Sequence, residues 1–428
     1  MRDLRIGRRA VLGAGIALPV AHAEAAMAPA SSASSATDEA FWKSIAAQYD
    51  VPSDVIQLEN GNWGAMPRPV LVEYLRLVER VNRDTSYYAR RGLAGDLIAG
   101  KADLATEMGV LAEDVALTRN ATEALKALIF GYNRLKPGDA VLYADLDYDS
   151  MQACMESLHA RRGVTVIKIA LPEPATRQSL VAAYTAAFEA NPRMRLVLLT
   201  HLSHRTGLVI PVREIAAAAR ARGIDTIVDA AHSWGQLDFA LPDLDCDFIG
   251  LNCHKWLGNP LGVGAMYVRR SALDRIDPDP ANDATMRDGV QSRVHTGTVD
   301  FAAQLTLPAA LRFQRSIGAA RRAARLNMLR DRWVSRVRRL PRVEVLTPDD
   351  AELHGGITSF RLHGLTSDAA NAALARQLLE KHRIFSVYRS GVMRGSCVRV
   401  TPGLFNSAEQ MDALAAAIED IASKPSRA

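Results

Sequence analysis

The sequence predicts an α/β fold: a mostly parallel β-sheet covered by helices, followed by a smaller α+β domain. Two observations support this fold class. The 428 residues are 48% hydrophobic and 23% charged, which is the composition of an ordinary globular protein with enough chain for two domains. After about residue 100, apolar runs of strand length alternate with helical patterns, and this alternation is typical of parallel sheets.

Residues 1–28 have the features of an export signal. Basic residues come first, then a weakly apolar stretch, then small residues spaced as Ala-x-Ala. The pair Arg8-Arg9 directly before Ala10 resembles the twin-arginine signal, which directs the export of folded proteins. We therefore expect recognition by the twin-arginine export machinery, cleavage of the signal peptide and a periplasmic mature protein. A disordered basic segment with a chance arginine pair is the alternative.

The net charge of +5 gives no reason to expect nucleic-acid binding. The signal segment holds four arginines and one aspartate up to Ala23, so its removal would lower the net charge from +5 to +2. No basic cluster with interleaved aromatic residues follows. No apolar run reaches the roughly 18 residues that a membrane span needs. The 4 cysteines form no Cys-x-x-Cys pair, so we expect neither a metal site nor a disulfide framework.

The remainder of the chain divides by composition and pattern. An Ala/Ser-rich linker spans residues 29–37, and a segment with a helical pattern and a turn-rich stretch spans residues 38–65. The large domain is expected over residues 66–300. Residues 301–428 are expected to hold a long connecting helix over 305–339 and then the small C-terminal domain.

Each strand of the large domain is predicted by a short apolar run bounded by Gly, Asp or Pro. These runs are residues 115–118, 140–143, 164–169, 196–200, 226–229, 248–251 and 264–268. Helical patterns lie between most of them, as at 211–222. In the small domain we expect strands at 343–346, 356–361 and 397–400 and a helix at 368–382.

Two charged residues follow neighbouring strands of the predicted sheet. Asp229 ends one apolar run, and Lys255 comes 26 residues later, just after the next run. The carboxyl ends of parallel strands meet at the edge where open α/β sheets bind ligands. An aspartate that pairs with a pyridinium nitrogen and a lysine that forms a Schiff base are what pyridoxal phosphate chemistry requires. Either residue alone indicates only a capping aspartate or a surface lysine, whereas the pair predicts a cofactor site.

A helix start follows the strand at 115–118. Asn120, Ala121 and Thr122 open an apolar helix over 124–130, and the N–H groups of such a start can bind an anion. The spacing by itself favours an ordinary N-cap over a phosphate site.

Longer motifs carry a family resemblance from about Leu58 to Ile421. They are LENGNWGAMPRPVL, TRNATEAL, DLDYDS, THLSHRTGLVIPV, IVDAAHSWGQ, CDFIGLNCHKWLGNPLGVGAMYV and VRVTPGLFN. The chain resembles the class V aminotransferases of the cysteine-desulfurase-like superfamily, and within them the isopenicillin N epimerase-like branch. The resemblance implies pyridoxal phosphate fold type I, which is aspartate aminotransferase-like and has a seven-stranded sheet in its large domain. It also implies pyridoxal 5'-phosphate as cofactor and a homodimer with shared active sites.

The resemblance assigns the site residues. Lys255 carries the cofactor as a Schiff base and Asp229 pairs with the ring nitrogen, so these two are the expected catalytic residues. Ala231 and Tyr148 are expected to pack against the ring, and His254 is expected to bind the phosphate. The other expected cofactor contacts are Ala121, Thr122, Thr206, His232, Gly297 and Thr298, with His204 as an alternative to Thr206; Gly297 and Thr298 reach the phosphate of the neighbouring subunit.

Three residues are expected to contact the substrate. Arg399 resembles the arginine that binds the substrate α-carboxylate, because a guanidinium fork matches a carboxylate. Asn62 and Trp63 belong to the segment over 38–65, which in this fold contributes to the small domain and the active site.

Several reactions fit this scaffold. We expect amino-group transfer on an amino acid or an amino-acid-derived substrate, with a peptide siderophore as one candidate. An amino-acid epimerase or racemase, or a C–S lyase acting on a cysteine or a sulfoxide, is the alternative. A non-catalytic binding protein is disfavoured because Lys255, Asp229 and Arg399 are all present. Desulfurases carry a nucleophilic cysteine where residues 382–394 have none, so sulfur delivery is not expected.

Overall fold

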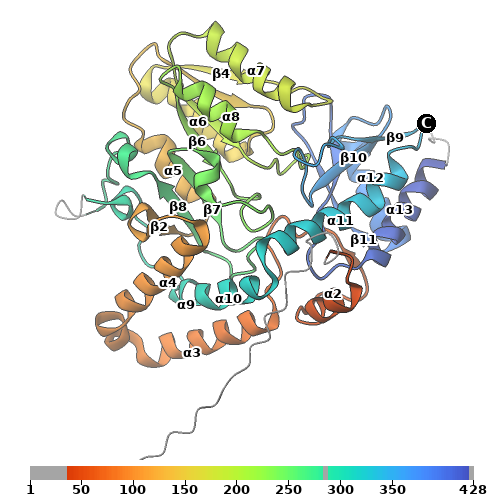
Figure 1. Cartoon of the computed structure of the whole chain (residues 1–428), viewed down its shortest axis with the longest axis horizontal. Coiled ribbons are helices and arrows are strands. Elements are labelled where there is room, and N and C mark those ends of the chain that lie inside the picture. The colour runs from red at the N-terminus through yellow and green to blue at the C-terminus, as the bar shows by residue number, and fades with distance from the viewer. Residues whose placement is uncertain (1–35, 283–287, 424–428) are drawn as a thin grey trace, which may run out of the picture.

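The computed structural model describes residues 36–282 and 288–423. The expected signal peptide and nearly all of the linker lie outside the described residues. The large domain fills the left of Figure 1 and the small domain the right, with α11 running between them. Within the described ranges, no helix is long and apolar enough to cross a membrane.

The large domain is built on a seven-stranded sheet in the order β2-β8-β7-β6-β5-β3-β4. The strands from β7 to β4 pair in parallel, whereas β8 is antiparallel to both of its neighbours. This confirms the predicted mostly parallel sheet. The strands are β2 (Val115–Thr118), β3 (Ala140–Ala144), β4 (Thr165–Ile169), β5 (Met194–Thr200), β6 (Asp225–Asp229), β7 (Phe248–Asn252) and β8 (Gly264–Val268).

Helices cover both faces of this sheet. One face carries α5 (Ala121–Gly131) and α6 (Asp149–Arg162), and the other carries α4 (Leu93–Met108), α7 (Arg177–Ala190), α8 (Val212–Arg220) and α10 (Leu307–Ile317). In β5, Leu196 and Leu198 pack on the α5 side, whereas Val197 and Leu199 pack on the opposite side. Because both faces are buried, the strands read as continuous apolar runs.

The expected single helix over 305–339 is wrong, because the chain breaks there twice. It forms α9 (Phe301–Leu305), α10 and α11 (Ala319–Val337). Gly318, between α10 and α11, has φ 90° and ψ 142°, a backbone conformation that ends a helix and that glycine adopts without strain. The helical periodicity continues past this glycine, so the sequence pattern concealed the break.

The small domain contains a four-stranded antiparallel sheet in the order β12-β13-β10-β9. Its strands are β9 (Val343–Val345), β10 (Thr358–Leu362), β12 (Val387–Arg389) and β13 (Cys397–Val400), and its helices are α11, α12 (Asp368–His382) and α13 (Ala408–Ser423). Val398 and Val400 join a core with Trp333 and Phe360. Alternation along β13 therefore turns Arg399 away from this core.

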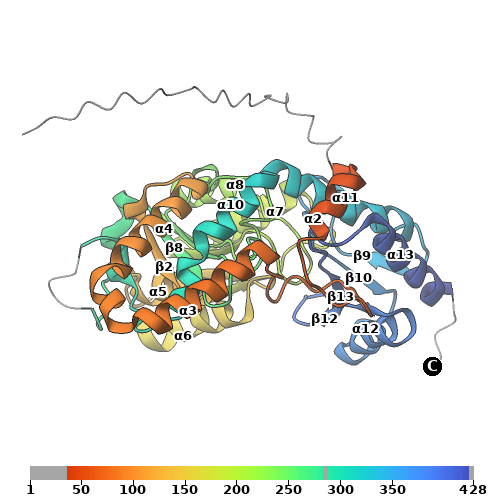
Figure 2. The ribbon, with the colours of Figure 1, turned by 90° about the horizontal axis from the view of Figure 1, so that it is seen from below.

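The N-terminal segment packs against the small domain. β1 (Ile56–Gln57) pairs in parallel with β11 (Ile384–Phe385). α2 (Glu39–Ala46) lies beside α11 in Figure 2, and its Trp42 is buried in one cluster with Leu326. These contacts carry the turn-rich stretch after Leu58 toward the large domain. Helix α3 (Arg68–Arg91) follows and contacts α4, α9 and α10.

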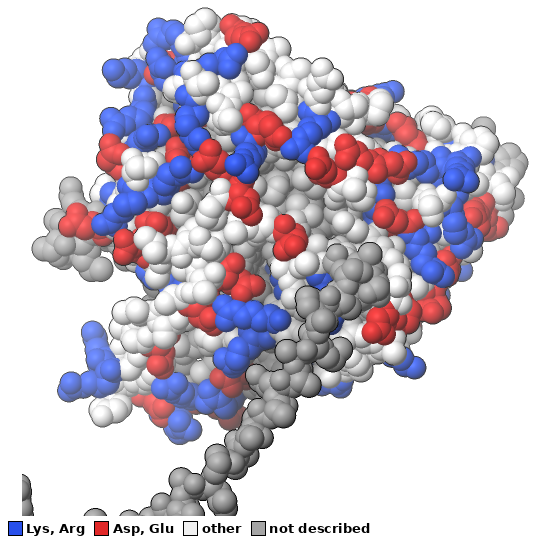
Figure 3. Space-filling model, in the orientation of Figure 1, with Lys and Arg blue, Asp and Glu red and all other residues white. Residues whose placement is uncertain are grey.

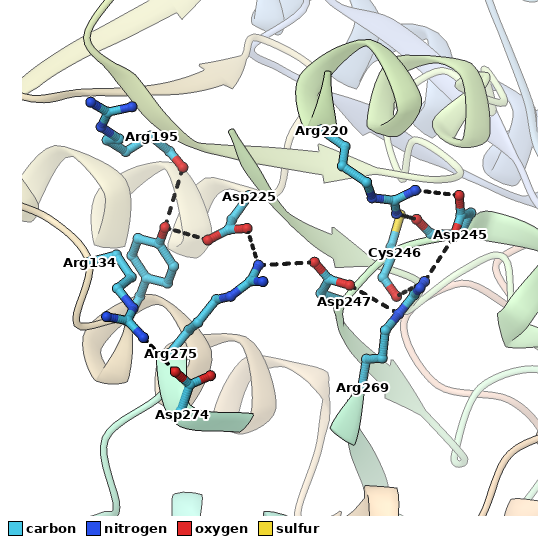
Figure 4. Close-up of polar contacts among 11 residues, drawn as sticks. Arg134, Arg195, Arg220, Asp225, Asp245, Cys246, Asp247, Arg269, Asp274 and Arg275 are labelled. Atoms are coloured by element: carbon cyan, nitrogen blue, oxygen red, sulfur yellow. Dashed lines mark hydrogen bonds and ion pairs between the residues drawn. The ribbon is translucent and has the colours of Figure 1, made fainter. Parts of the chain in front are cut away.

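Charged residues form a network of ion pairs along the edge of the large sheet where its parallel strands begin. Figure 4 shows this network, in which Arg275 Nη1 lies 2.5 Å from Asp225 Oδ1 and 3.4 Å from Asp247 Oδ2. Arg269 Nε lies 3.0 Å from Asp247 Oδ1. On the face drawn in Figure 3, basic and acidic side chains are likewise interspersed. The edge where open α/β sheets bind ligands is the opposite one, at the carboxyl ends of the parallel strands.

Candidate active site

A cavity of about 550 Å³ lies at the carboxyl edge of the large sheet. The ends of β5, β6 and β7 and the first turn of α5 form one side, while β12, β13 and the N-terminal segment form the other. The structure brings most predicted site residues together here. They are Asn62, Ala121, Thr122, Tyr148, Asp229, Ala231, His232, His254, Lys255 and Arg399, together with the alternative His204.

Four predicted residues do not line this cavity. Trp63 is 55% exposed beside Asn62. Thr206 is buried in the turn after β5, where its hydroxyl accepts a hydrogen bond from the Leu208 N–H at 3.3 Å. Its expected contact with the cofactor stays a prediction. Gly297 and Thr298 are exposed. Their expected contact is with the neighbouring subunit and stays a prediction.

Lys255 is held beside a neutral histidine. Its Nζ lies 2.9 Å from His232 Nε2. Burial, partly opposed by the charge of Asp229, lowers the pKa of Lys255 to about 8. Burial and then the Lys255 charge hold the pKa of His232 well below its ordinary value, so the imidazole stays neutral and its Nε2 accepts from Lys255. Lys255 is therefore an amine that can gain or lose a proton near neutral pH.

Asp229 is the last residue of β6 and is buried. Its Oδ1 accepts a hydrogen bond from the Ala231 N–H at 2.9 Å, which fixes the carboxylate at the strand end. Burial raises the pKa of Asp229, while the Ala231 N–H and the Lys255 charge oppose that rise. A buried carboxylate is stabilised by a cationic partner, and a protonated ring nitrogen would supply one.

The first turn of α5 forms an anion-binding cradle with the end of β7. Asn252 Oδ1 accepts from the Ala121 N–H at 2.8 Å, and Asn120 Oδ1 caps the helix by accepting from the Glu123 N–H at 2.9 Å. His254 Nδ1 lies 3.0 Å from the Val263 carbonyl, which can only accept, so Nδ1 carries the proton. Because these donors have protein partners, what remains to attract a phosphate is the positive end of α5 and the Thr122 side chain, which lines the cavity as His254 does. Asn252 therefore joins the end of β7 to the start of α5.

Tyr148 and Ala231 both line the cavity, where an aromatic side chain and a small side chain can pack against the flat ring of a cofactor. Tyr148 lies at the start of α6, and its ring meets His204 edge-on with centroids 5.2 Å apart. Nδ1 of His204 and Nδ1 of His232 are buried without a hydrogen-bond partner in the described part of the chain. Buried polar atoms of this kind indicate that a bound group completes the site.

Sequence reasoning missed Glu59. Its Oε1 accepts from Arg399 Nη2 at 2.5 Å and from Arg389 Nη2 at 3.2 Å. Arg399 Nη1 also donates to the His204 carbonyl at 2.6 Å, so both terminal nitrogens of Arg399 have protein partners. One sequence feature could have indicated this role: Glu59 comes directly after the apolar residue Leu58 and before a turn.

The lysine and aspartate at the sheet edge, with an anion cradle beside them, fit pyridoxal phosphate and define a fold type I enzyme. The family model for aminotransferase class V matches residues 81–414. The chain belongs to this pyridoxal phosphate-dependent family.

Relatives cover most of the chain. It is 30% identical over 397 residues to isopenicillin N epimerase of Streptomyces clavuligerus, covering 89% of this chain and 98% of that protein. It is 24% identical over 275 residues to L-cysteine desulfhydrase of Arabidopsis thaliana, covering 60% of each.

Solved structures share the fold. Cysteine desulfurase from Thermococcus onnurineus NA1 matches with a TM-score of 0.76 at 20% identity, over 89% of this chain and 98% of that one. The cystine C–S lyase C-DES, solved with its product cysteine persulfide, matches with a TM-score of 0.74 at 22% identity, over 86% and 98%.

Proposed function

We propose that this enzyme acts on the amino group of an amino acid or an amino-acid-derived substrate and transfers that group. One observation carries the proposal: a buried lysine with a pKa of about 8 shares the cavity with Asp229 and Arg399. These three groups supply a base, a partner for a cationic ring nitrogen and a carboxylate-binding guanidinium.

When bound, pyridoxal phosphate supplies a conjugated ring that takes up the electron pair left when a bond to the substrate Cα breaks. Asp229 holds the proton on the ring nitrogen, which keeps the ring electron-poor. Lys255 removes the Cα proton and can return it to another atom, since its Nζ titrates near neutral pH. His232 orients Nζ through the 2.9 Å contact and adds no charge of its own.

Epimerisation is the second candidate. It is supported by the two isopenicillin N epimerases, of which this chain covers 98% each. In that reaction the proton returns to Cα from the other side and no amine is lost. A C–S lyase is the third candidate, supported by the desulfhydrase relatives.

Catalysis by a nucleophilic cysteine of the protein itself is disfavoured. All four cysteines lie in the described ranges and are buried. Burial raises the pKa of Cys397 to about 11, and its Sγ lies 3.8 Å from the Arg205 carbonyl. A thiol held in this way is a poor nucleophile.

Product analysis in D₂O separates the three reactions. The holoenzyme would be incubated with L-amino acids or short peptides, with and without a 2-oxo acid as acceptor. Amino transfer gives a new oxo acid and an aminated acceptor. Epimerisation gives the D-isomer with deuterium at Cα, and elimination gives free ammonia. A D-isomer without any oxo acid would overturn amino transfer.

We also propose that the enzyme works in the periplasm, after export in a folded state. The pair Arg8-Arg9 before Ala10 supports this proposal, as does the need to load the cofactor before export. A peptide siderophore is then one candidate substrate class. Replacing both arginines by lysine should leave the precursor in the cytoplasm, and an unchanged periplasmic yield would contradict the route.

A homodimer is the third part of the proposal. Val72, Leu75 and Val78 follow one another at intervals of three on α3 and are exposed, which is unusual for large apolar side chains. A second copy of the chain would cover them and bring Gly297 and Thr298 to its phosphate site. Sedimentation equilibrium of the holoenzyme measures the mass. A fully active monomer would contradict the shared site.

A further inference from the structure

Two arginines of the small domain share one buried carboxylate at the cavity wall. Arg389 ends β12 opposite Cys397 of β13, and Arg399 lies two residues further along β13; both arginines donate to Oε1 of Glu59. Both arginines line the cavity. Arg399 is 1% exposed and Glu59 is 7% exposed, so water does little to screen their charges. We call these three residues the arginine pair and its glutamate.

The pair and its glutamate together carry one net positive charge. The other charges of the cavity wall occur with a partner of opposite sign. Lys255 faces Asp229, and Asp149 is bonded to Arg205. The wall therefore retains a single unbalanced positive charge, which lies at the arginine pair.

Unused donors remain at the same place. Nε of Arg389 and Nε of Arg399 are both buried and lack a hydrogen-bond partner among the residues described. Burial and the neighbouring Arg399 lower the pKa of Arg389 to about 10, as expected where like charges are close and under-compensated. One additional carboxylate would satisfy the donors and balance the charge. A second additional carboxylate would leave a buried negative charge, which is unfavourable.

We propose that Glu59 determines substrate specificity by limiting the arginine pair to one substrate carboxylate. This inference rests on the proposed function, in which the substrate is an amino acid or is derived from one. Glu59 does not contact the substrate. Its negative charge balances one of the two guanidinium groups, which the second carboxylate of a dicarboxylic substrate would otherwise balance, and its Oε1 holds both groups in position.

The test compares two probes that differ only at one end of the chain. Valerate and glutarate have five carbons each, and glutarate replaces the terminal methyl group by a second carboxylate. Isothermal titration calorimetry on the holoenzyme gives the ratio of their affinities. In the wild type we expect glutarate to bind no more tightly than valerate. In Glu59→Gln the ratio should shift toward glutarate by about tenfold or more, since a charge-assisted pair becomes available.

Two variants serve as controls. Glu59→Asp keeps the negative charge and should keep the wild-type ratio. Glu344→Gln removes a carboxylate that lies 2.8 Å from the buried Arg361, outside the cavity, and should also keep it. Melting temperatures of all variants report folding.

Two outcomes would overturn the proposal. One is an unchanged ratio in a folded Glu59→Gln protein; if both probes also bind more weakly by the same factor, the role of Glu59 is purely structural. If Glu59→Gln does not fold, a wild-type enzyme that binds glutarate tenfold more tightly than valerate would still refute the limit. Because these measurements involve no turnover, they stand apart from a failure to find amino transfer.

Discussion

Gly64 is the point where the N-terminal segment touches the backbone of the catalytic lysine, and Gly64→Ala tests that contact. The Gly64 N–H donates to the His254 carbonyl at 2.9 Å. A Cβ on Gly64 would lie 1.7 Å from the Lys255 carbonyl oxygen and 2.8 Å from its carbon. Real Cβ atoms do not approach other atoms within 3.0 Å, so the segment or the lysine turn must move.

The expected loss of stability in Gly64→Ala follows from the kind of atom that the new Cβ would meet. A backbone carbonyl cannot rotate aside as a flexible side chain can, so we expect an overpacking cost of about 1–3 kcal/mol. Loss of the hydrogen bond to His254 adds about 1 kcal/mol. Together these should lower the melting temperature by about 2–5 °C for a chain of this length. Movement of Lys255 should also lower turnover by about tenfold or more, since catalysis depends on sub-ångström placement.

The assay is thermal unfolding of the holoenzyme, followed by fluorescence, with turnover measured in parallel. Gly95→Ala is the matched control, because Gly95 lies in α4 and its Cβ would meet nothing within 4 Å. That variant should be as stable as the wild type or more so, since alanine favours a helix by about 1 kcal/mol over glycine. If the Gly64→Ala enzyme has the melting temperature and turnover of the wild type, the contact between Gly64 and the Lys255 backbone does not constrain the lysine.

Four further predictions concern single residues. Lys255→Ala should abolish cofactor that borohydride fixes covalently, and mass spectrometry would detect any adduct that contradicts this. Asp229→Asn should keep the cofactor but lose turnover by about 100-fold or more, and wild-type turnover would exclude the ring-nitrogen role. Arg399→Ala should lower kcat/KM by about 30- to 1,000-fold for α-amino acids and by less for their amides, so equal losses would indicate a structural role. Burial lowers the pKa of His201 from 6.5 to about 4, so the unfolded chain binds the proton first and stability falls as the pH drops from about 6.5 to 4. His201→Gln should flatten that decline in melting curves taken across this range, and an equal slope would refute the assignment.

The sequence by itself determined the architecture of the large domain. All of its strands except the edge strand β4 are buried on both faces, so each of them appears as a short apolar run that can be recognised without knowing its neighbours. Asp229 and Lys255 could also be placed at one edge of the sheet, because neighbouring parallel strands have their carboxyl ends at the same edge. Asn120 was predictable as the start of α5, since an N-cap depends only on the next three residues.

Tertiary structure decided what surrounds those residues. Glu59 and Arg399 are 340 positions apart and meet because Glu59 pairs with Thr401, directly after β13, and no local pattern encodes that pairing. Asn252 supports Ala121 across 131 positions, again through packing. The charge left for a substrate at the arginine pair therefore could not be read from the sequence, because it depends on which buried charges the folded chain brings within hydrogen-bonding distance.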